Sequence, residues 1–265
     1  MIKKETVLNR ILKLSGALVK GVGYLFHTLF PKKRFTIPKH SKAKIKSDNE
    51  YKIPKIVWQT NFTNEVTLPV YVNYLVIRLL SLDYDYYYVS TEDREEFIKE
   101  NADEDTYKAF MRLNDGAAQA DFWRVFVLNT KGGVYLDIDA HPVWPLSKLI
   151  KPDYKELILL NKQHYTNYFM ASAPNNPILK RALDIMVDNI KNNRVERGVY
   201  FLTGPEVLNQ AIEELKVTPN HRFYRVTCVQ GSFTNEYFQY MDKPRSKWTY
   251  KDKRELLRDI KEDES

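Results

Sequence analysis

Apolar and polar positions follow two different periods along the chain, and these predict a series of helices and strands. Between residues 7 and 29, apolar side chains recur every three or four positions, as on one face of a helix. Short apolar runs predict strands at 52–60, 84–89, 134–138, 156–161, 168–172 and 223–229. Helices are predicted at 70–82, 90–100, 104–113, 117–129, 176–192 and 204–215. Strands that alternate with helices indicate an α/β sheet.

The N-terminal helix has an apolar stripe with basic residues on the other side. The stripe consists of Val7, Ile11, Leu14, Leu18, Val22, Leu25 and Leu29, and is widened by Leu8, Leu12, Val19, Phe26 and Phe30. The opposite side carries Arg10, Lys13, Lys20 and His27. This pattern is typical of a helix in a membrane interface, where each nearby cation contributes about 1 kcal/mol. Residues 5–46 are therefore predicted to bind an anionic membrane surface; the alternative is a helix packed on the body or on a partner protein.

A spanning helix or a cleaved signal peptide fits the same segment less well. The apolar run at 14–30 is short and contains Lys20 and His27. A long basic stretch follows it, without a clear small-x-small cleavage site. We expect residues 1–50 to form a basic membrane-associating arm and linker, and residues 51–265 to form the folded domain. The expected localisation is peripheral, at the cytoplasmic face of the inner or plasma membrane.

The composition describes a globular chain whose positive charge is concentrated at one end. Hydrophobic residues make up 43% and charged residues 28%, which excludes a disordered chain. Residues 1–50 hold 12 of the 41 Lys and Arg but only 3 of the 34 Asp and Glu. The body is thus nearly neutral, which argues against a nucleic-acid partner. The single Cys228 cannot form an internal disulfide, which favours a reducing compartment, and is most simply a core strand residue.

The segment 131–139 combines a helix stop, a buried strand and two carboxylates. It reads Lys-Gly-Gly-Val-Tyr-Leu-Asp-Ile-Asp, and Gly132 and Gly133 end the preceding helix. In an extended chain Asp137 and Asp139 would leave from the same face. Because converging carboxylates repel unless a cation lies between them, the pair indicates a Mg²⁺ or Mn²⁺ site. The alternative is a turn, in which Asp is common.

Two more charged residues stand on the helix before this motif. Asp121 and Arg124 lie at positions i and i+3, which by itself indicates an ordinary helical ion pair worth a few tenths of a kcal/mol. Ligands of open α/β sheets bind beyond the carboxyl ends of the strands, where Asp137 and Asp139 would lie. His141, next to the Asp pair, is interpreted as structural rather than as a metal ligand.

Four segments in this order resemble glycosyltransferase family 32, the sugar-transferase group with a DXD motif, and more distantly the glucosylating domain of the large clostridial toxins. The segments are 53–59, 118–124 with 132–139, 167–174, and 203–205. The resemblance covers roughly residues 52–250. It implies a GT-A fold, with a Rossmann-like central sheet flanked by helices. It also implies a nucleotide-sugar donor, Mn²⁺ or Mg²⁺, and transfer with retention at the anomeric carbon.

The resemblance assigns roles to the residues that match. Asp139 would bind the metal, and Asp137 would contact the donor and help to hold the metal. Asp121 would face sugar hydroxyls, Arg124 the sugar or phosphate, and Asn167 the donor.

Further donor contacts are implied for Trp58, Gln59, Tyr135, Ser246 and Trp248. Trp58 would stack on the nucleotide or fill the core, and Tyr135 would touch the donor or pack in the sheet. Family members often end in a His-rich segment before Ser-Trp; here Ser246-Lys-Trp248 lacks the His, so the final metal ligand stays open.

The predicted function is transfer of a hexose from a UDP-sugar or GDP-mannose to a membrane-proximal glycan or lipid-linked acceptor. Such an enzyme would serve surface polysaccharide or lipopolysaccharide synthesis. One alternative is a non-catalytic membrane adaptor, which would explain the N-terminal arm but not the paired Asp. Another is a haloacid-dehalogenase-type phosphatase, whose Asp-x-Asp motif is followed by Thr or Val where this chain has His141.

Overall fold

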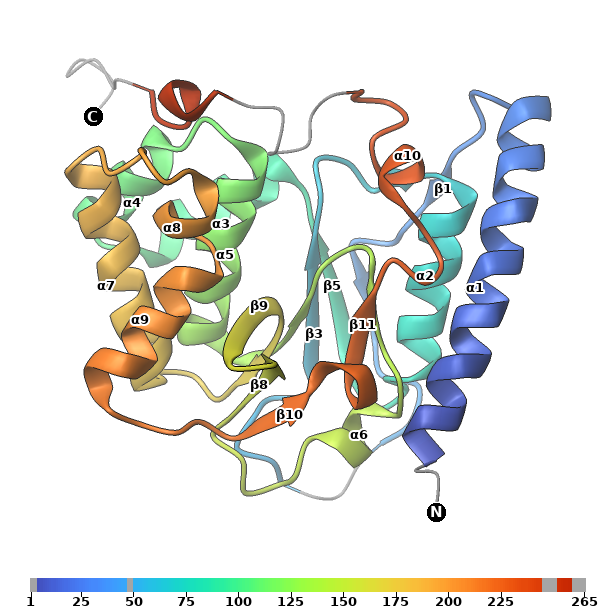
Figure 1. The fold of residues 1–265 in the computed structure, drawn as a ribbon, viewed down its shortest axis with the longest axis horizontal. Coiled ribbons are helices and arrows are strands. Elements are labelled where there is room, and N and C mark those ends of the chain that lie inside the picture. The colour runs from blue at the N-terminus through green and yellow to red at the C-terminus, as the bar shows by residue number, and fades with distance from the viewer. Residues whose placement is uncertain (1–3, 47–49, 245–251, 259–265) are drawn as a thin grey trace.

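The computed structural model describes residues 4–46, 50–244 and 252–258 and shows a central mixed sheet flanked by helices (Figure 1). The predicted α/β class is thereby confirmed. The strands are β1 (Phe35–Thr36), β2 (His40–Ser41), β3 (Ile56–Thr60), β4 (Glu65–Val66), β5 (Asp85–Val89), β6 (Gly133–Leu136), β7 (Ala140–Pro142), β8 (Glu156–Asn161), β9 (His164–Ser172), β10 (His221–Phe223) and β11 (Cys228–Gln230). Seven of them form the central sheet in the order β10-β8-β9-β6-β3-β5-β2. The others pair as β1 with β4 and β7 with β11.

Helices cover both faces of this sheet. They are α1 (Lys4–Leu29), α2 (Leu68–Leu79), α3 (Thr91–Asn101), α4 (Glu104–Arg112), α5 (Gly116–Lys131), α6 (Leu146–Leu149), α7 (Pro177–Lys191), α8 (Val199–Leu202), α9 (Pro205–Leu215) and α10 (Glu236–Gln239), with 3₁₀ turns at Tyr224–Val226 and Lys253–Glu255. Figure 1 shows α1 and α2 on one side of the sheet and α4, α5, α7 and α9 on the other. The sheet is therefore the middle of three layers.

Alternation along the central strands divides the core in two. Val57 on β3 and Val134 on β6 pack on the side of α2, whereas Trp58 and Tyr135 pack on the side of α5. β3 pairs in parallel with both β5 and β6. Strands buried on both faces read as nearly continuous apolar runs, which explains why these two strands were evident from the sequence.

The predicted strand at 223–229 is wrong. The segment instead forms β10 and β11, which belong to different sheets and are separated by the 3₁₀ turn Tyr224–Val226. Thr227 closes that turn: its backbone N–H donates to the Tyr224 carbonyl at 3.0 Å, and its hydroxyl donates to the Phe223 carbonyl at 3.0 Å. A side chain that bonds the local backbone competes with strand pairing, and apolar content alone does not reveal this.

Helix α1 packs on the body with the side opposite its apolar stripe. Its buried residues are Asn9, Gly16, Gly23 and His27. The Asn9 amide donates to the Arg225 carbonyl at 2.7 Å, and His27 Nε2 accepts the Leu68 N–H at 3.0 Å. The seven stripe residues stay 45–77% exposed. Packing on the body, which was the alternative for this helix, is therefore observed, and it leaves the apolar stripe uncovered by the described residues.

The rest of the N-terminal segment also joins the body. β2 pairs antiparallel with β5 at the edge of the central sheet, and β1 pairs with β4. The division at residue 50 stays a prediction, although part of the N-terminal segment contributes to the sheet. Within the described ranges, no helix has both the length and the apolar content needed to cross a membrane.

Close approach of α1 to the body predicts opposite effects for two glycines of this helix. A Cβ added at Gly16 would lie 2.2 Å from the Ser232 carbonyl oxygen, whereas nothing lies within 4 Å of one added at Gly21. We expect Gly16→Ala to destabilise the protein by about 1–3 kcal/mol, because backbone atoms would have to move. Gly21→Ala should stabilise it by about 0.5–1 kcal/mol, because alanine favours the helix. Urea unfolding of both variants measures this, and equal shifts would contradict the observed packing.

Candidate active site

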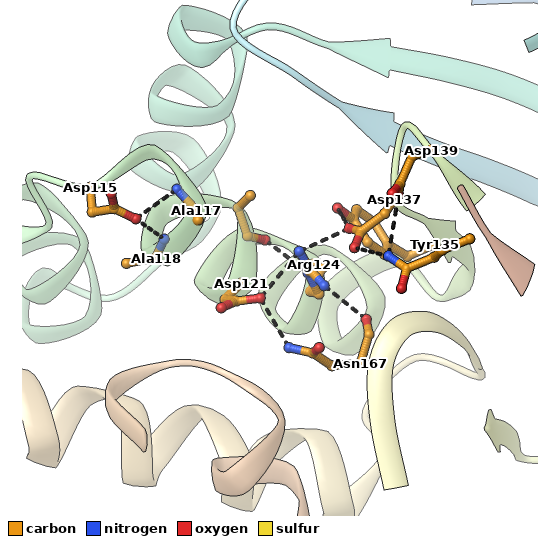
Figure 2. Close-up of polar contacts among 11 residues, drawn as sticks. Asp115, Ala117, Ala118, Asp121, Arg124, Tyr135, Asp137, Asp139 and Asn167 are labelled. Atoms are coloured by element: carbon orange, nitrogen blue, oxygen red, sulfur yellow. Dashed lines mark hydrogen bonds and ion pairs between the residues drawn. The ribbon is translucent and has the colours of Figure 1, made fainter. Parts of the chain in front are cut away.

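The site forms where the first turns of α5 meet the carboxyl end of β6. Asp115 caps α5: its Oδ1 accepts the N–H groups of Ala117 and Ala118 at 2.9 and 3.0 Å (Figure 2). Gly132 and Gly133 end the helix with φ of +69° and +108° and lead directly into β6. Such angles strain any residue with a Cβ. The two ends of α5 thus fix the helix relative to the strand.

Asp137 and Asp139 lie in a turn rather than in an extended strand. β6 ends at Leu136, and the Ala140 N–H donates to the Asp137 carbonyl at 2.9 Å. The predicted extended geometry is therefore wrong, whereas the prediction of a site at this pair of acids stays a prediction. The carboxylates nevertheless converge, because the Gln230 amide nitrogen lies 3.2 Å from Asp137 Oδ2 and 3.2 Å from Asp139 Oδ1.

Arg124 connects the helix to this turn (Figure 2). Its Nη2 lies 3.1 Å from Asp121 Oδ1 and 3.0 Å from Asp137 Oδ1. Its Nη1 donates to the Asn167 carbonyl at 3.0 Å, and the Asn167 amide donates to Asp121 at 3.0 Å. The guanidinium also lies over the Tyr135 ring, 4.6 Å from its centroid, and the Tyr135 hydroxyl donates to Asp137 at 2.8 Å.

Asp121 and Arg124 form the helical ion pair that was the alternative interpretation, but this pair is buried and also includes Asp137. The Arg124 side chain is only 7% exposed, and that of Asp121 only 11%. Buried ion pairs cost desolvation energy and often add little net stability. A buried arginine shared by two carboxylates is therefore a candidate functional group.

Burial disfavours the negative charge of all three carboxylates. It raises the pKa of Asp121 to about 7, although the nearby Arg124 guanidinium opposes the shift. Burial also raises the pKa of Asp137 above its ordinary value. Burial and the charge of Asp137 raise the pKa of Asp139 to about 6, against the amides of Gln230 and Gln239. Full ionisation of the site at neutral pH therefore calls for additional positive charge.

These shifts predict how the stability of the metal-free protein depends on pH. A carboxyl group whose pKa is higher in the folded state contributes stability that is fully present below about pH 4 and is lost as the pH rises. For Asp121 the loss should extend to about pH 7. Because of this contribution, urea unfolding in EDTA should give a lower free energy of unfolding at about pH 8 than at about pH 5. Asp121→Asn should reduce the difference; an unchanged difference would contradict the assignment.

Two buried amides hold the backbone of the turn. Gln59 donates to the Asp137 carbonyl at 3.0 Å and accepts from the Tyr86 hydroxyl at 2.8 Å. Asn73 donates to the carbonyls of Ile138 and Ala140, both at 2.9 Å. Gln59 is 0% exposed and holds the turn from within the protein, and its donor contact stays a prediction.

Asn73 and Gln230 were not found from the sequence. Asn73 is one polar residue within the otherwise apolar helix α2, which is a weak signal. Gln230 is the last residue of the short strand β11 and stands directly before Gly231. Asp137 likewise stands at the end of an apolar strand, directly after β6. A polar side chain at a strand end was therefore the available signal for Gln230.

Trp58 belongs to the core and does not present a free face to a nucleotide. Its Nε1 donates to the Gly132 carbonyl at 2.9 Å. Its ring stacks on Tyr87 with 4.9 Å between centroids, and Trp123 packs edge-on at 6.2 Å. Its packing is that of the alternative, a core tryptophan, and its stacking on a nucleotide stays a prediction.

The remaining candidate residues are placed as follows. His141 is fully buried, and its Nδ1 donates to the Pro142 carbonyl at 2.9 Å. Burial lowers the pKa of His141 to about 4, so the ring is neutral and structural, as we interpreted it. The predicted donor contacts Ser246 and Trp248 lie outside the described residues.

The chemistry of the turn fits a divalent cation only in part. In the described ranges, no group of three or more His, Cys, Asp and Glu side chains is arranged to hold a metal ion. The carboxylates of Asp137 and Asp139 supply hard oxygen ligands, and Mg²⁺ and Mn²⁺ are commonly bound by one or two carboxylates together with substrate phosphates. The two residues therefore fit a cation whose coordination is completed by the phosphate oxygens of a bound substrate.

Comparison with known families finds a match for this part of the chain. Residues 69–179, which include Asp121, Arg124, Asp137 and Asp139, match the family described as glycosyltransferase sugar-binding region containing DXD motif. This segment is similar to the sugar-binding region of those glycosyltransferases, which agrees with the prediction of an enzyme.

Two relatives and one solved structure extend the comparison. A 114-residue segment is 32% identical to a protein named "Toxin" from Photorhabdus asymbiotica and 28% identical to "Toxin Afp18" from Yersinia ruckeri. It covers 40% of this chain but only 4% and 5% of those longer proteins. The structure of PaToxG glycosyltransferase aligns over 79% of each chain with a TM-score of 0.51 and 19% identity, which is a likeness of fold.

These relatives correct the predicted localisation. The prediction of a peripheral enzyme at the cytoplasmic face of the inner or plasma membrane is wrong, because the matching proteins are named as toxins and not as enzymes of surface-polysaccharide synthesis. The physical basis of that prediction was the apolar stripe of α1. That stripe stays exposed, and the helix packs on the protein itself through its other side, with Gly16 and Gly23.

Proposed function

We propose that the chain is a metal-dependent glycosyltransferase that transfers a hexose from a nucleoside-diphosphate sugar, with retention at the anomeric carbon. The observation that carries this proposal is the buried Arg124, held between Asp121 and Asp137 beside the Asp137–Asp139 turn. UDP-sugars and GDP-mannose are the donor candidates. The more specific assignment to family 32 is part of the same proposal.

Each residue of the cluster has a role that follows from its contacts. Asp137 and Asp139 would hold Mn²⁺ or Mg²⁺, which when bound neutralises the charge of the departing diphosphate. Tyr135 orients Asp137 through its 2.8 Å hydrogen bond. Arg124 adds a fixed positive charge at the same place, where it stabilises negative charge that develops on the donor.

Asp121 and Asn167 would face the hydroxyl groups of the sugar. The Asn167 amide fixes Asp121 at 3.0 Å, and its carbonyl accepts from Arg124 at 3.0 Å. This network sets the orientation of two polar groups before the donor binds. Because these polar groups are already oriented, little free energy is needed to reorganise them during the reaction.

For the acceptor, we propose that the chain is the glycosyltransferase part of a toxin-type protein. The relatives named as toxins support this. The glycan or glycolipid acceptor of surface-polysaccharide synthesis, predicted from the sequence, receives no support from them. The sugar and the acceptor molecule are not chosen by any contact within the site.

The test is calorimetric titration of UDP and of GDP, each with and without Mn²⁺. We expect one nucleotide to bind, and Mn²⁺ to strengthen that binding by at least about tenfold, because diphosphate oxygens complete the ligands of the cation. Asp139→Ala should remove the effect of Mn²⁺. Slow release of free sugar from the matching nucleotide sugar would then identify the donor.

The outcome separates the transferase from the non-catalytic adaptor. Failure of a well-folded wild-type protein to bind either nucleotide with Mn²⁺ would refute the proposed function. Binding that is equally strong in EDTA would refute the metal dependence but not the nucleotide-sugar site.

A further inference from the structure

Gln230 places a single polar atom between the two carboxylates of the motif. Its amide nitrogen donates to Asp137 Oδ2 and to Asp139 Oδ1, both at 3.2 Å. A cation shared by the same two oxygen atoms would need a position between them. The side chain of Gln230 therefore reaches the place where the proposed metal would bind.

The backbone of Gln230 is fixed to the turn that carries the two acids. β11 pairs antiparallel with β7, with Gln230 opposite Ala140. The next residue extends the attachment, since the Gly231 N–H donates to the Asp139 carbonyl at 3.0 Å. Gln230 thus stays with Asp137 and Asp139, while its exposed side chain is free to turn about its own bonds.

The carboxamide offers both kinds of atom that this position requires. Without a cation, its NH₂ group bridges the two carboxylates and offsets part of their repulsion. Turned about the Cγ–Cδ bond, the same group presents Oε1, and amide oxygens are hard ligands suited to Mn²⁺ and Mg²⁺. A glutamine can therefore serve the motif in both states.

We propose that Gln230 supplies the third protein ligand of the cation, through Oε1, and in the metal-free protein holds Asp137 and Asp139 together. This rests on the proposed function in that Asp137 and Asp139 bind the cation. It fills the ligand position that the sequence left open. It also explains why three His, Cys, Asp or Glu side chains are not needed among the described residues at this turn.

The test is a titration of the whole chain with Mn²⁺ in the absence of nucleotide. The EPR signal of free Mn²⁺ measures how much of the metal is unbound. Gln230→Leu should raise the Kd for Mn²⁺ by about 10–100-fold, because it removes a ligand without changing charge. Gln230→Glu should keep or improve the affinity, because it retains an oxygen at the same position. Gln210→Leu is the matched control: Gln210 also donates to a carboxylate, that of Glu214 at 2.9 Å, on the exposed side of α9.

The outcomes distinguish this proposal from the proposed function. If the wild type binds Mn²⁺, Asp139→Ala loses it and Gln230→Leu keeps it, the Gln230 assignment is overturned and the metal site stands. If Gln239→Leu weakens binding and Gln230→Leu does not, the third ligand is Gln239, whose amide also lowers the pKa of Asp139. If the wild type does not bind Mn²⁺ in the absence of nucleotide, the Gln230 assignment is overturned, whereas the proposed function is decided separately by the nucleotide titrations, in which phosphate oxygens complete the ligands.

Discussion

Asp139→Asn is expected to reduce metal-dependent hydrolysis of the donor by roughly 10³-fold, the scale seen when a charge-stabilising group is removed from an active site. The amide keeps the size of the side chain but not its charge. Asp139 has lost most of its contact with water, and burial with the charge of Asp137 raises its pKa to about 6. Because folding does not use this charge, we expect the free energy of unfolding in EDTA to be unchanged or higher.

The matched control is Asp184→Asn, which removes a carboxylate from the exposed ion pair with Lys180. That variant should keep wild-type turnover. Release of sugar from the nucleotide sugar, measured with saturating Mn²⁺ and in EDTA, gives both values. If Asp139→Asn kept more than about a tenth of the wild-type rate, cation binding by Asp139 would not be part of the reaction.

Arg124→Met is expected to destabilise the protein by about 3–5 kcal/mol at neutral pH, as removal of one partner from a buried ionic group does. Asp121 and Asp137 would lose their common partner, at 3.1 and 3.0 Å. The loss of stability should be smaller at about pH 5, because the carboxylates can then take up a proton and become neutral. Turnover should also be lost, since Arg124 has no substitute in the described cluster.

Arg181→Met is the matched control for this loss. Arg181 pairs with Glu214 at 2.6 Å, but its side chain is 43% exposed, so its removal should cost no more than about 1 kcal/mol. In the Arg124→Met background, Asp121→Asn should restore part of the stability, because it removes one unpaired charge. Urea unfolding of the wild type and of these three variants measures this. Equal costs for the two Arg substitutions would show that Arg124 does not hold the buried carboxylates.

Local sequence patterns determined most of the elements of this protein. The apolar run at 156–161 became β8 with the same bounds, and 104–113 became α4 with one residue fewer. Glycine pairs and capping residues act within a few residues of themselves, so Gly132, Gly133 and Asp115 fixed the ends of α5. The order of helices and strands was sufficient for the α/β class.

Within the candidate site, the sequence alone was sufficient to find the residues that stand close together along the chain. Asp121 and Arg124 are three residues apart on one helix, and Asp137 and Asp139 are two apart after one strand. That Arg124 joins the two pairs depends on how α5 packs against β6. That Asp137–Asp139 is a turn depends on Gln59 and Asn73, which hold its backbone from β3 and α2.

The tertiary structure alone decided which face of α1 is buried and which distant side chain meets the acids. Periodicity identifies an apolar stripe but not its partner, and α1 packs instead through Gly16 and Gly23, where the absent side chains let backbones approach. Gln230 lies 93 residues from Asp137, and only the pairing of β11 with β7 brings them together. A sequence pattern reports the local cost of exposing a residue; which surfaces meet is decided by packing between elements far apart in the chain.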